Sequence, residues 1–241
     1  FQYRELKLFW NKPLKFILGK GKYVNIDNKR IEKLLEDIIQ GPLPKVEQNF
    51  KIKNIDSLNL KQFVPKSYLT YNETTIPMSI LAAKKGERII QLQALKEYLP
   101  LVWDIENKDH KLNYQNHFIS WKAFKINSYD ITSKDEFLKT IMYSIQHDCY
   151  IYLFVNEKYI EQSRRFNLDY DHDYCITGYN LDTKKLSLMG YTKRNFTCFE
   201  ASIEVMQEAF FNQVNPSPFL ISIKPKSFIK APTKKDILTE I

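Results

Sequence analysis

The sequence predicts an α+β protein with an antiparallel sheet in its C-terminal half. Segments of helical periodicity dominate the first half of the chain, and strand-like runs dominate the second. Residues 169–191 have the pattern of a β-hairpin, which is the connection that joins neighbouring antiparallel strands. A Rossmann or barrel fold is not favoured, because helices and strands alternate along the chain in those folds.

Three segments in the first half combine apolar residues at helical spacing with a Gly or Pro at the end. They are residues 31–39, which end at Gly41-Pro42, residues 76–85, which end at Gly86, and residues 87–99, which end at Pro100. The stretch between the first two is irregular, with possible short strands around Phe50 to Ile55. We interpret residues 1–70 as an N-terminal arm and helical extension.

The main α+β domain is expected over residues 71–232. Ser133 and Glu136 form a capping-box pattern that predicts the start of a helix, and Ser202 caps a second helix. Residues 149–155 (CYIYLFV) form an unbroken apolar run, which is typical of a strand buried on both faces. Further strands are expected at residues 118–126 and 219–223, and the start of a further helix at residues 233–241.

The predicted hairpin has a histidine at its open end. If the turn centres between Asp182 and Thr183, paired residue numbers sum to about 365, so His172 faces residues 191–193 on the second strand. No Asp or Glu lies among those facing residues. His172 is the position around which the sequence supports a candidate site.

Length and composition indicate a protein that folds without metal or disulfide staples. A chain of 241 residues with 44% hydrophobic residues buries on the order of 70% of its extended surface. The three cysteines are odd in number and lack CxxC spacing, which favours buried free thiols in a reducing, cytoplasmic compartment. No apolar run approaches the roughly 20 residues that span a bilayer, so no membrane partner is expected.

The net charge of +8 is concentrated at the two ends of the chain. Residues 1–22 carry a net charge of +5 and residues 224–241 carry +3, so the middle of the chain is neutral. Since no helix-turn-helix, zinc-finger or RNP pattern is present, a nucleic-acid partner is not expected. The basic ends are interpreted as solvated segments or as contact points for an acidic protein partner.

Motifs for cofactors and metals are weak. The sequence contains neither GxGxxG nor GxxxxGK[ST], so no nucleotide cofactor is expected. Asp169, Asp171 and Asp173 alternate like the opening of a calcium loop, but an EF-hand requires Gly at Tyr174 and Glu at Asn180. A solvated acidic loop is favoured, with a divalent cation held by two of these carboxylates and His172 as the alternative.

The order of elements, and the segment HDYCITGYNLDTKKLSLMGY in particular, resembles a known family over about residues 130–225. The histidine at the start of a hairpin and the following GY[ND] step are similar to C39-type peptidases, and more narrowly to the butirosin-biosynthesis acyltransferase family. This resemblance implies a papain-like fold. In that family a cysteine at the N-terminus of an early helix attacks a carbonyl group, a histidine takes its proton, and an acid or amide orients the imidazole.

The family roles carry over to this chain only in part. His172 matches the family's histidine, and Asn195 and Asn180 are the candidates for the orienting amide. The approach to the corresponding early helix reads Asn72-Glu73-Thr74-Thr75 and contains no cysteine. Cys149 is the remaining candidate nucleophile, unless a cysteine stood upstream of Phe1 or was substituted.

The resemblance therefore implies two functions of different classes. The first is cysteine-dependent acyl or aminoacyl transfer, or peptide processing, in bacterial natural-product biosynthesis, with an acyl-carrier or peptidyl substrate. Its active site is degenerate unless the nucleophile was lost or substituted. The second is a non-catalytic scaffold of the same fold that binds a peptide or carrier protein.

Overall fold

The computed structural model describes residues 36, 41–42, 44–46, 50–65, 72–86, 123–216 and 219–227. The helix expected at residues 31–39, apart from Glu36, lies outside these residues, and so does the helix expected at residues 87–99. The basic N-terminal end, residues 1–22, and the C-terminal end from residue 228 onwards also lie outside them. The helical N-terminal half is thus described only in part.

An antiparallel sheet of seven strands forms the centre of the described structure, with the order β2-β7-β3-β4-β5-β6 and β1 paired to β4. Every pair of neighbouring strands is antiparallel, which confirms the α+β class. The strands are β1 (Ser57–Asn59), β2 (Phe124–Asp130), β3 (Tyr150–Asn156), β4 (Asp171–Asn180), β5 (Lys185–Tyr191), β6 (Phe196–Ser202) and β7 (Phe219–Pro225).

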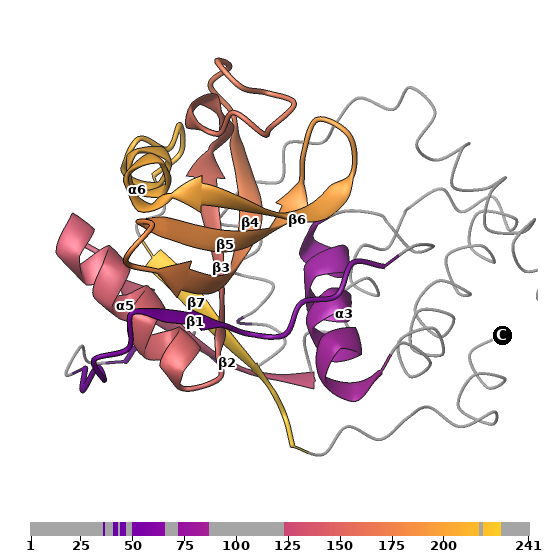
Figure 1. Ribbon diagram of the computed structural model, residues 1–241, viewed down its shortest axis with the longest axis vertical. Coiled ribbons are helices and arrows are strands. Elements are labelled where there is room, and N and C mark those ends of the chain that lie inside the picture. The colour runs from indigo at the N-terminus through magenta and orange to yellow at the C-terminus, as the bar shows by residue number, and fades with distance from the viewer. Residues whose placement is uncertain are drawn as a thin grey trace, which may run out of the picture.

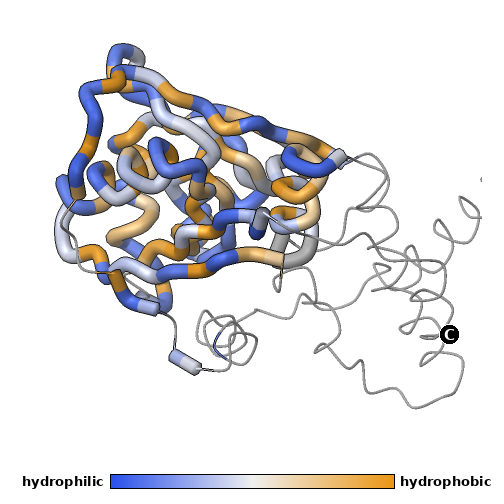
Figure 2. Tube along the Cα trace, turned by 90° about the horizontal axis from the view of Figure 1, so that it is seen from below, coloured by the Kyte–Doolittle hydropathy of each residue, from blue (hydrophilic) through white to orange (hydrophobic). Residues whose placement is uncertain are grey.

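Helices cover both faces of this sheet (Figure 1). Helix α3 (Asn72–Lys85) packs on one face, where Ile76, Met78 and Ile80 join a buried cluster with Cys175. Helices α5 (Lys134–Gln146) and α6 (Ile203–Phe211) pack on the other face, against the side chains of Tyr174 and Ile176. Figure 2 shows that hydrophobic and hydrophilic residues alternate along much of the tube.

Both predicted helix caps are confirmed. The backbone N–H of Glu136 donates to Ser133 Oγ at the start of α5, and that of Val205 donates to Ser202 Oγ at the start of α6. The Glu136 carboxylate also accepts hydrogen bonds from the backbone N–H and the hydroxyl of Thr132, the residue before the cap. Each cap satisfies backbone donors that the first helical turn leaves unpaired.

The predicted central strand and hairpin are also confirmed. All residues of β3 are buried, and the strand lies between β7 and β4. In the hairpin, Asn180 pairs with Lys185 and Cys175 with Met189, so the paired numbers sum to 365 and 364 on the two sides of an irregularity between Ile176 and Gly178. The observed pairs end at Cys175 and Met189, so the pairing expected for His172 stays a prediction.

Two strand boundaries differ from the prediction. Strand β2 ends at Asp130 instead of residue 126, and it pairs over its whole length with β7. No strand forms at residues 50–55, and the short strand β1 lies at Ser57–Asn59, where it pairs with the end of β4. Part of the segment interpreted as an N-terminal arm therefore belongs to the sheet.

Gly178 explains why β1 can approach β4 so closely. A Cβ atom at this position would lie 1.7 Å from Asn59 Oδ1 and 2.7 Å from the carbonyl oxygen of Leu58. Only glycine leaves room for the paired backbone at this point. None of the described helices is long and apolar enough to cross a membrane.

Candidate functional site

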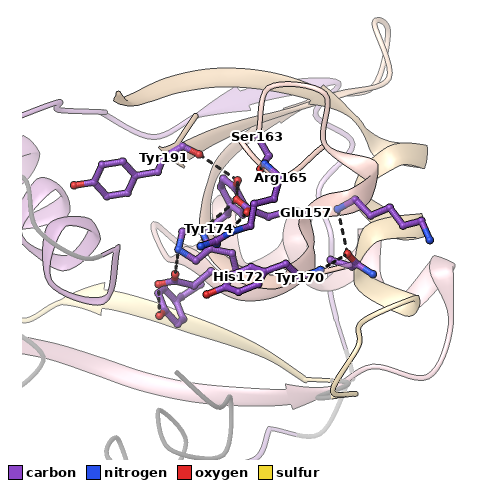
Figure 3. Close-up of polar contacts among 11 residues, drawn as sticks. Glu157, Ser163, Arg165, Tyr170, His172, Tyr174 and Tyr191 are labelled. Carbon is purple, nitrogen blue, oxygen red and sulfur yellow. Dashed lines mark hydrogen bonds and ion pairs between the residues drawn. The ribbon is translucent and has the colours of Figure 1, made fainter. Parts of the chain in front are cut away.

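His172 lies near the start of β4, where it pairs with Val155 near the end of the central strand β3. Its side chain is 27% exposed and lies close to the rings of Tyr170 and Tyr174. Strand side chains alternate between the two faces of a sheet, so His172 and Tyr174 share the face that α5 and α6 cover. Figure 3 shows the polar cluster that surrounds the imidazole.

Glu157 is the buried acid of this cluster. It follows β3 directly and opens the short 3-10 helix Glu157–Tyr159, and its side chain is only 4% exposed. Glu157 Oε1 lies 3.3 Å from His172 Nδ1 and accepts a hydrogen bond of 2.5 Å from the hydroxyl of Tyr174. Glu157 Oε2 lies 3.5 Å from Arg165 Nη1. One carboxylate therefore contacts two side chains of β4 and one side chain of the β3–β4 loop.

A second carboxylate faces the other side of the imidazole. Asp173 Oδ1 lies 3.7 Å from His172 Nε2, and Asp173 is 6% exposed. The hydroxyl of Tyr152 on β3 donates to Asp173 Oδ2 at 2.5 Å. Both ring nitrogens of His172 thus face a buried carboxylate.

These contacts shift the pKa of both Glu157 and His172. Burial alone would raise the pKa of Glu157, but the hydrogen bond and charge of His172, with hydrogen bonds from Tyr174 and Ser163, lower it below its ordinary value. Burial alone would lower the pKa of His172, but the hydrogen bond to Glu157 and the charges of Asp173 and Glu157 raise it. The arrangement favours an imidazolium beside two carboxylates.

The same cluster holds the loop between β3 and β4. The Arg165 guanidinium lies 3.4 Å from the centre of the Tyr170 ring while it pairs with Glu157. At the base of the loop, the N–H of Glu157 donates to the carbonyl of Tyr170, and Lys158 pairs with Asp169 at 3.0 Å. The two ends of the loop are consequently fixed to each other and to the site.

The two predicted orienting amides occupy other positions. Asn180 is the last residue of β4, and its side chain accepts from the N–H of Thr183 in the hairpin turn. Asn195 is exposed in the turn between β5 and β6, where its carbonyl accepts from Thr192. The structure places the carboxylates of Glu157 and Asp173 beside the imidazole instead.

The structure does not bring Cys149 to His172. Cys149 precedes the first residue of β3, whereas Val155, the partner of His172, is the last but one. At about 3.3 Å per residue, the two positions are separated by roughly 20 Å along the strand. Burial raises the pKa of the Cys149 thiol, although the charge of Lys224 opposes this effect.

The other two cysteines lie on the face that α3 covers. Cys175 is fully buried in the cluster with Tyr152 and Met189, and Cys198 packs against that cluster. Burial raises the pKa of the Cys175 thiol well above its ordinary value, and it also raises that of Cys198. A raised pKa keeps a thiol protonated and poorly nucleophilic.

The three aspartates that resemble a calcium loop each bind protein groups. Asp169 contacts Lys158 and accepts a hydrogen bond from Asn156. Asp171 accepts from the N–H groups of Val214 and Asn215, and Asp173 accepts from Tyr152. Within the described part of the chain, no group of three His, Cys, Asp or Glu side chains has the geometry to hold a metal ion.

Sequence reasoning missed Glu157, although a signal for it exists. The hairpin register excludes an acid on the strand that faces His172, but it gives no information about the end of β3, which pairs with β4 from the other side. An acidic residue immediately after a fully buried strand is rarely tolerated without a partner. The neighbouring strand start supplies that partner in His172.

Chemically, this cluster is suited to hold a positive charge on the imidazole and to fix the β3–β4 loop. A base that removes a proton from a thiol needs an unprotonated ring nitrogen, which two carboxylates disfavour. No protein-family model matches the sequence, and a search of curated proteins gives no significant match.

Proposed function

We propose that this chain is a non-catalytic binding module of papain-like fold that recognises a peptide or a carrier protein. The observation that carries the proposal is the position of the His172 imidazole between the carboxylates of Glu157 and Asp173. These two groups stabilise the protonated ring, so His172 contributes to the fold and to the shape of the neighbouring loop.

The papain-like part of the proposal is supported by the arrangement of the elements. An early helix, α3, packs on an antiparallel sheet, and a later strand, β4, begins beside the histidine and contains the Gly178-Tyr179-Asn180 step. The early helix and the histidine, however, lie on opposite faces of the sheet. Helix α3 packs on the face of Cys175, whereas His172 shares the opposite face with Tyr174.

The competing function is cysteine-dependent acyl transfer or peptide processing, which the sequence resemblance implies. It requires a thiol that His172 activates. The raised pKa values of the Cys149, Cys175 and Cys198 thiols support the binding module over this function.

Labelling with iodoacetamide near neutral pH distinguishes the two functions. The full chain is treated for increasing times, and the extent of labelling at each cysteine is measured by mass spectrometry. We expect all three thiols to react more slowly than free cysteine, because burial keeps them protonated. His172→Ala should not slow any of them.

The matched control is His147→Ala, which removes an exposed histidine at the end of α5. A thiol that reacts faster than free cysteine in the wild type and in His147→Ala, but not in His172→Ala, would establish an activated nucleophile and refute the non-catalytic proposal.

A further inference from the structure

The loop of residues 161–168 and the turn of residues 192–195 form one continuous surface next to the His172 cluster, which we call the loop surface. The N–H of Lys193 donates to the carbonyl of Gln162 at 2.8 Å. The Arg164 guanidinium donates to the carbonyls of Lys193 and Arg194 at 3.0 and 3.1 Å. Two segments that are distant in sequence are thereby joined.

This surface exposes large apolar side chains on a loop that is held in place. Leu168 is 60% exposed and Phe166 is 38% exposed. The loop beneath them is fixed, because Ser163 is fully buried and the N–H of Asn167 donates to the carbonyl of Lys158. Single exposed apolar residues are common on protein surfaces, but a rigid loop that presents two of them loses little conformational entropy when it binds.

The charge of the loop surface is basic. Lys158 and Arg165 pair with Asp169 and Glu157 at its edge. Among the residues that the structure describes, Arg164, Lys193 and Arg194 form no ion pair with a carboxylate, and the Lys193 ammonium lies 5.5 Å from the centre of the Phe166 ring. Glu161 is the one acidic residue in the two segments themselves. The surface therefore complements a negatively charged partner that also carries an apolar group.

We propose that the loop surface docks an acidic, amphipathic peptide segment of a partner protein. Carboxylates of the segment lie against Arg164, Lys193 and Arg194, and an apolar side chain packs on Leu168 and Phe166. A peptide fits better than a nucleic acid, because single-stranded nucleic acids are held by successive bases that stack on aromatic faces. The loop surface has a single aromatic residue, Phe166, and its most exposed apolar group, Leu168, has no aromatic face. This inference rests on the proposed binding role and specifies its partner.

A random peptide library displayed on phage tests the inference directly. The full chain is used as bait, and a Lys193→Gln/Arg194→Gln variant is used for counter-selection. Among the described residues, these two side chains form no ion pair, and the Lys193 ammonium contacts the Phe166 ring. We expect the enriched peptides to combine Asp or Glu with Leu, Ile or Phe. The affinity of a synthetic enriched peptide, measured by fluorescence anisotropy, should fall at least tenfold in this variant and in Leu168→Ser.

The matched control is Lys51→Gln/Lys125→Gln, which removes the same charge from exposed positions outside the loop surface. It should bind the peptide as the wild type does, and circular dichroism should show the same unfolding midpoint for all variants. Failure to enrich acidic peptides, equal loss of affinity in the control, or tighter binding of an oligothymidylate with a steep salt dependence would overturn the inference.

The labelling experiment and the peptide selection test the two proposals independently. Fast labelling that depends on His172 would refute the non-catalytic role whatever the peptides show. Slow labelling together with failed peptide selection would leave the non-catalytic role intact and remove the loop surface as the docking site.

Discussion

The substitution Glu157→Gln tests the structural role of the buried cluster with the smallest change of shape. It removes one negative charge while it keeps the size of the side chain. The amide offers one acceptor oxygen, whereas the Glu157 carboxylate meets donors at both oxygens, with Tyr174 and His172 at Oε1 and Arg165 at Oε2. The amide NH₂ group must therefore face another donor.

The expected cost follows from the burial of these groups. Glu157 is 4% exposed and His172 is 27% exposed, so solvent screens their interaction only weakly. Removing one partner of a buried ion pair typically costs about 3 to 5 kcal/mol, and we expect about 3 kcal/mol for Glu157→Gln near pH 6 because Asp173 still faces the imidazole. Above the raised folded-state pKa of His172, where the ring is neutral, the cost should fall to about 1 to 2 kcal/mol for the remaining hydrogen bonds.

Urea unfolding followed by circular dichroism measures this difference. The free energy of unfolding is compared at the two pH values for the wild type, Glu157→Gln and Glu161→Gln, which is an exposed glutamate in the same loop and should have little effect. An equal loss at both pH values would refute the charge interaction with His172. A loss below about 1 kcal/mol near pH 6 would refute the buried cluster itself.

Three further predictions follow from the same structure. Because the pKa of His172 is raised, its stabilising contribution should be complete below about pH 6.5 and should be lost as the pH rises through the folded-state pKa. Because the pKa of Glu157 is lowered, its contribution should be complete above about pH 4.3 and should be lost on further acidification. Proton NMR titration, with His172→Ala to assign the ring signals, checks the shift of the His172 pKa. Ile151→Asp should lower the free energy of unfolding by several kcal/mol because it buries an unpaired carboxylate in the central strand, while Ile151→Val should lower it by about 1 kcal/mol. Rapid hydrogen exchange throughout β3 in the wild type would contradict the burial of this strand. Gly178→Ala should destabilise the chain by about 1 to 3 kcal/mol because its Cβ would collide with β1, whereas Gly41→Ala, which meets no atom within 4 Å, serves as the control in the same unfolding assay.

Local patterns were sufficient to predict most of the described elements. The capping residues Ser133 and Ser202, the apolar run of β3 and the hairpin are each determined by residues close in sequence, and the structure contains all of them. The strand order was not predictable in this way. Strand β7 lies between β2 and β3 although it is the last of the described strands in the sequence, because tertiary packing and not local propensity selects its neighbours.

Of the residues that form the candidate site, only His172 was predictable from the sequence. His172 was identified because it stands at a hairpin whose turn can be located, and the hairpin fixes contacts with β5 alone. Its decisive contacts come from elsewhere: Glu157 follows β3, and Asp173 is the next residue in the strand. Adjacent strand residues point to opposite faces, which argued against an Asp173 contact, yet at this position near the start of β4 its Oδ1 still lies 3.7 Å from Nε2.

The position of Asp173 also explains why a single substitution is not expected to convert this cluster into a catalytic pair. A thiol that gives its proton to His172 needs an unprotonated ring nitrogen within hydrogen-bond reach. Nδ1 faces Glu157, and Nε2 faces Asp173, which Tyr152 holds from the central strand. Replacing either carboxylate leaves the other to favour the imidazolium, and replacing Glu157 also releases Arg165 and the loop that it fixes. Loop anchoring and general-base catalysis therefore make opposite demands on His172, and the contacts around the ring favour anchoring.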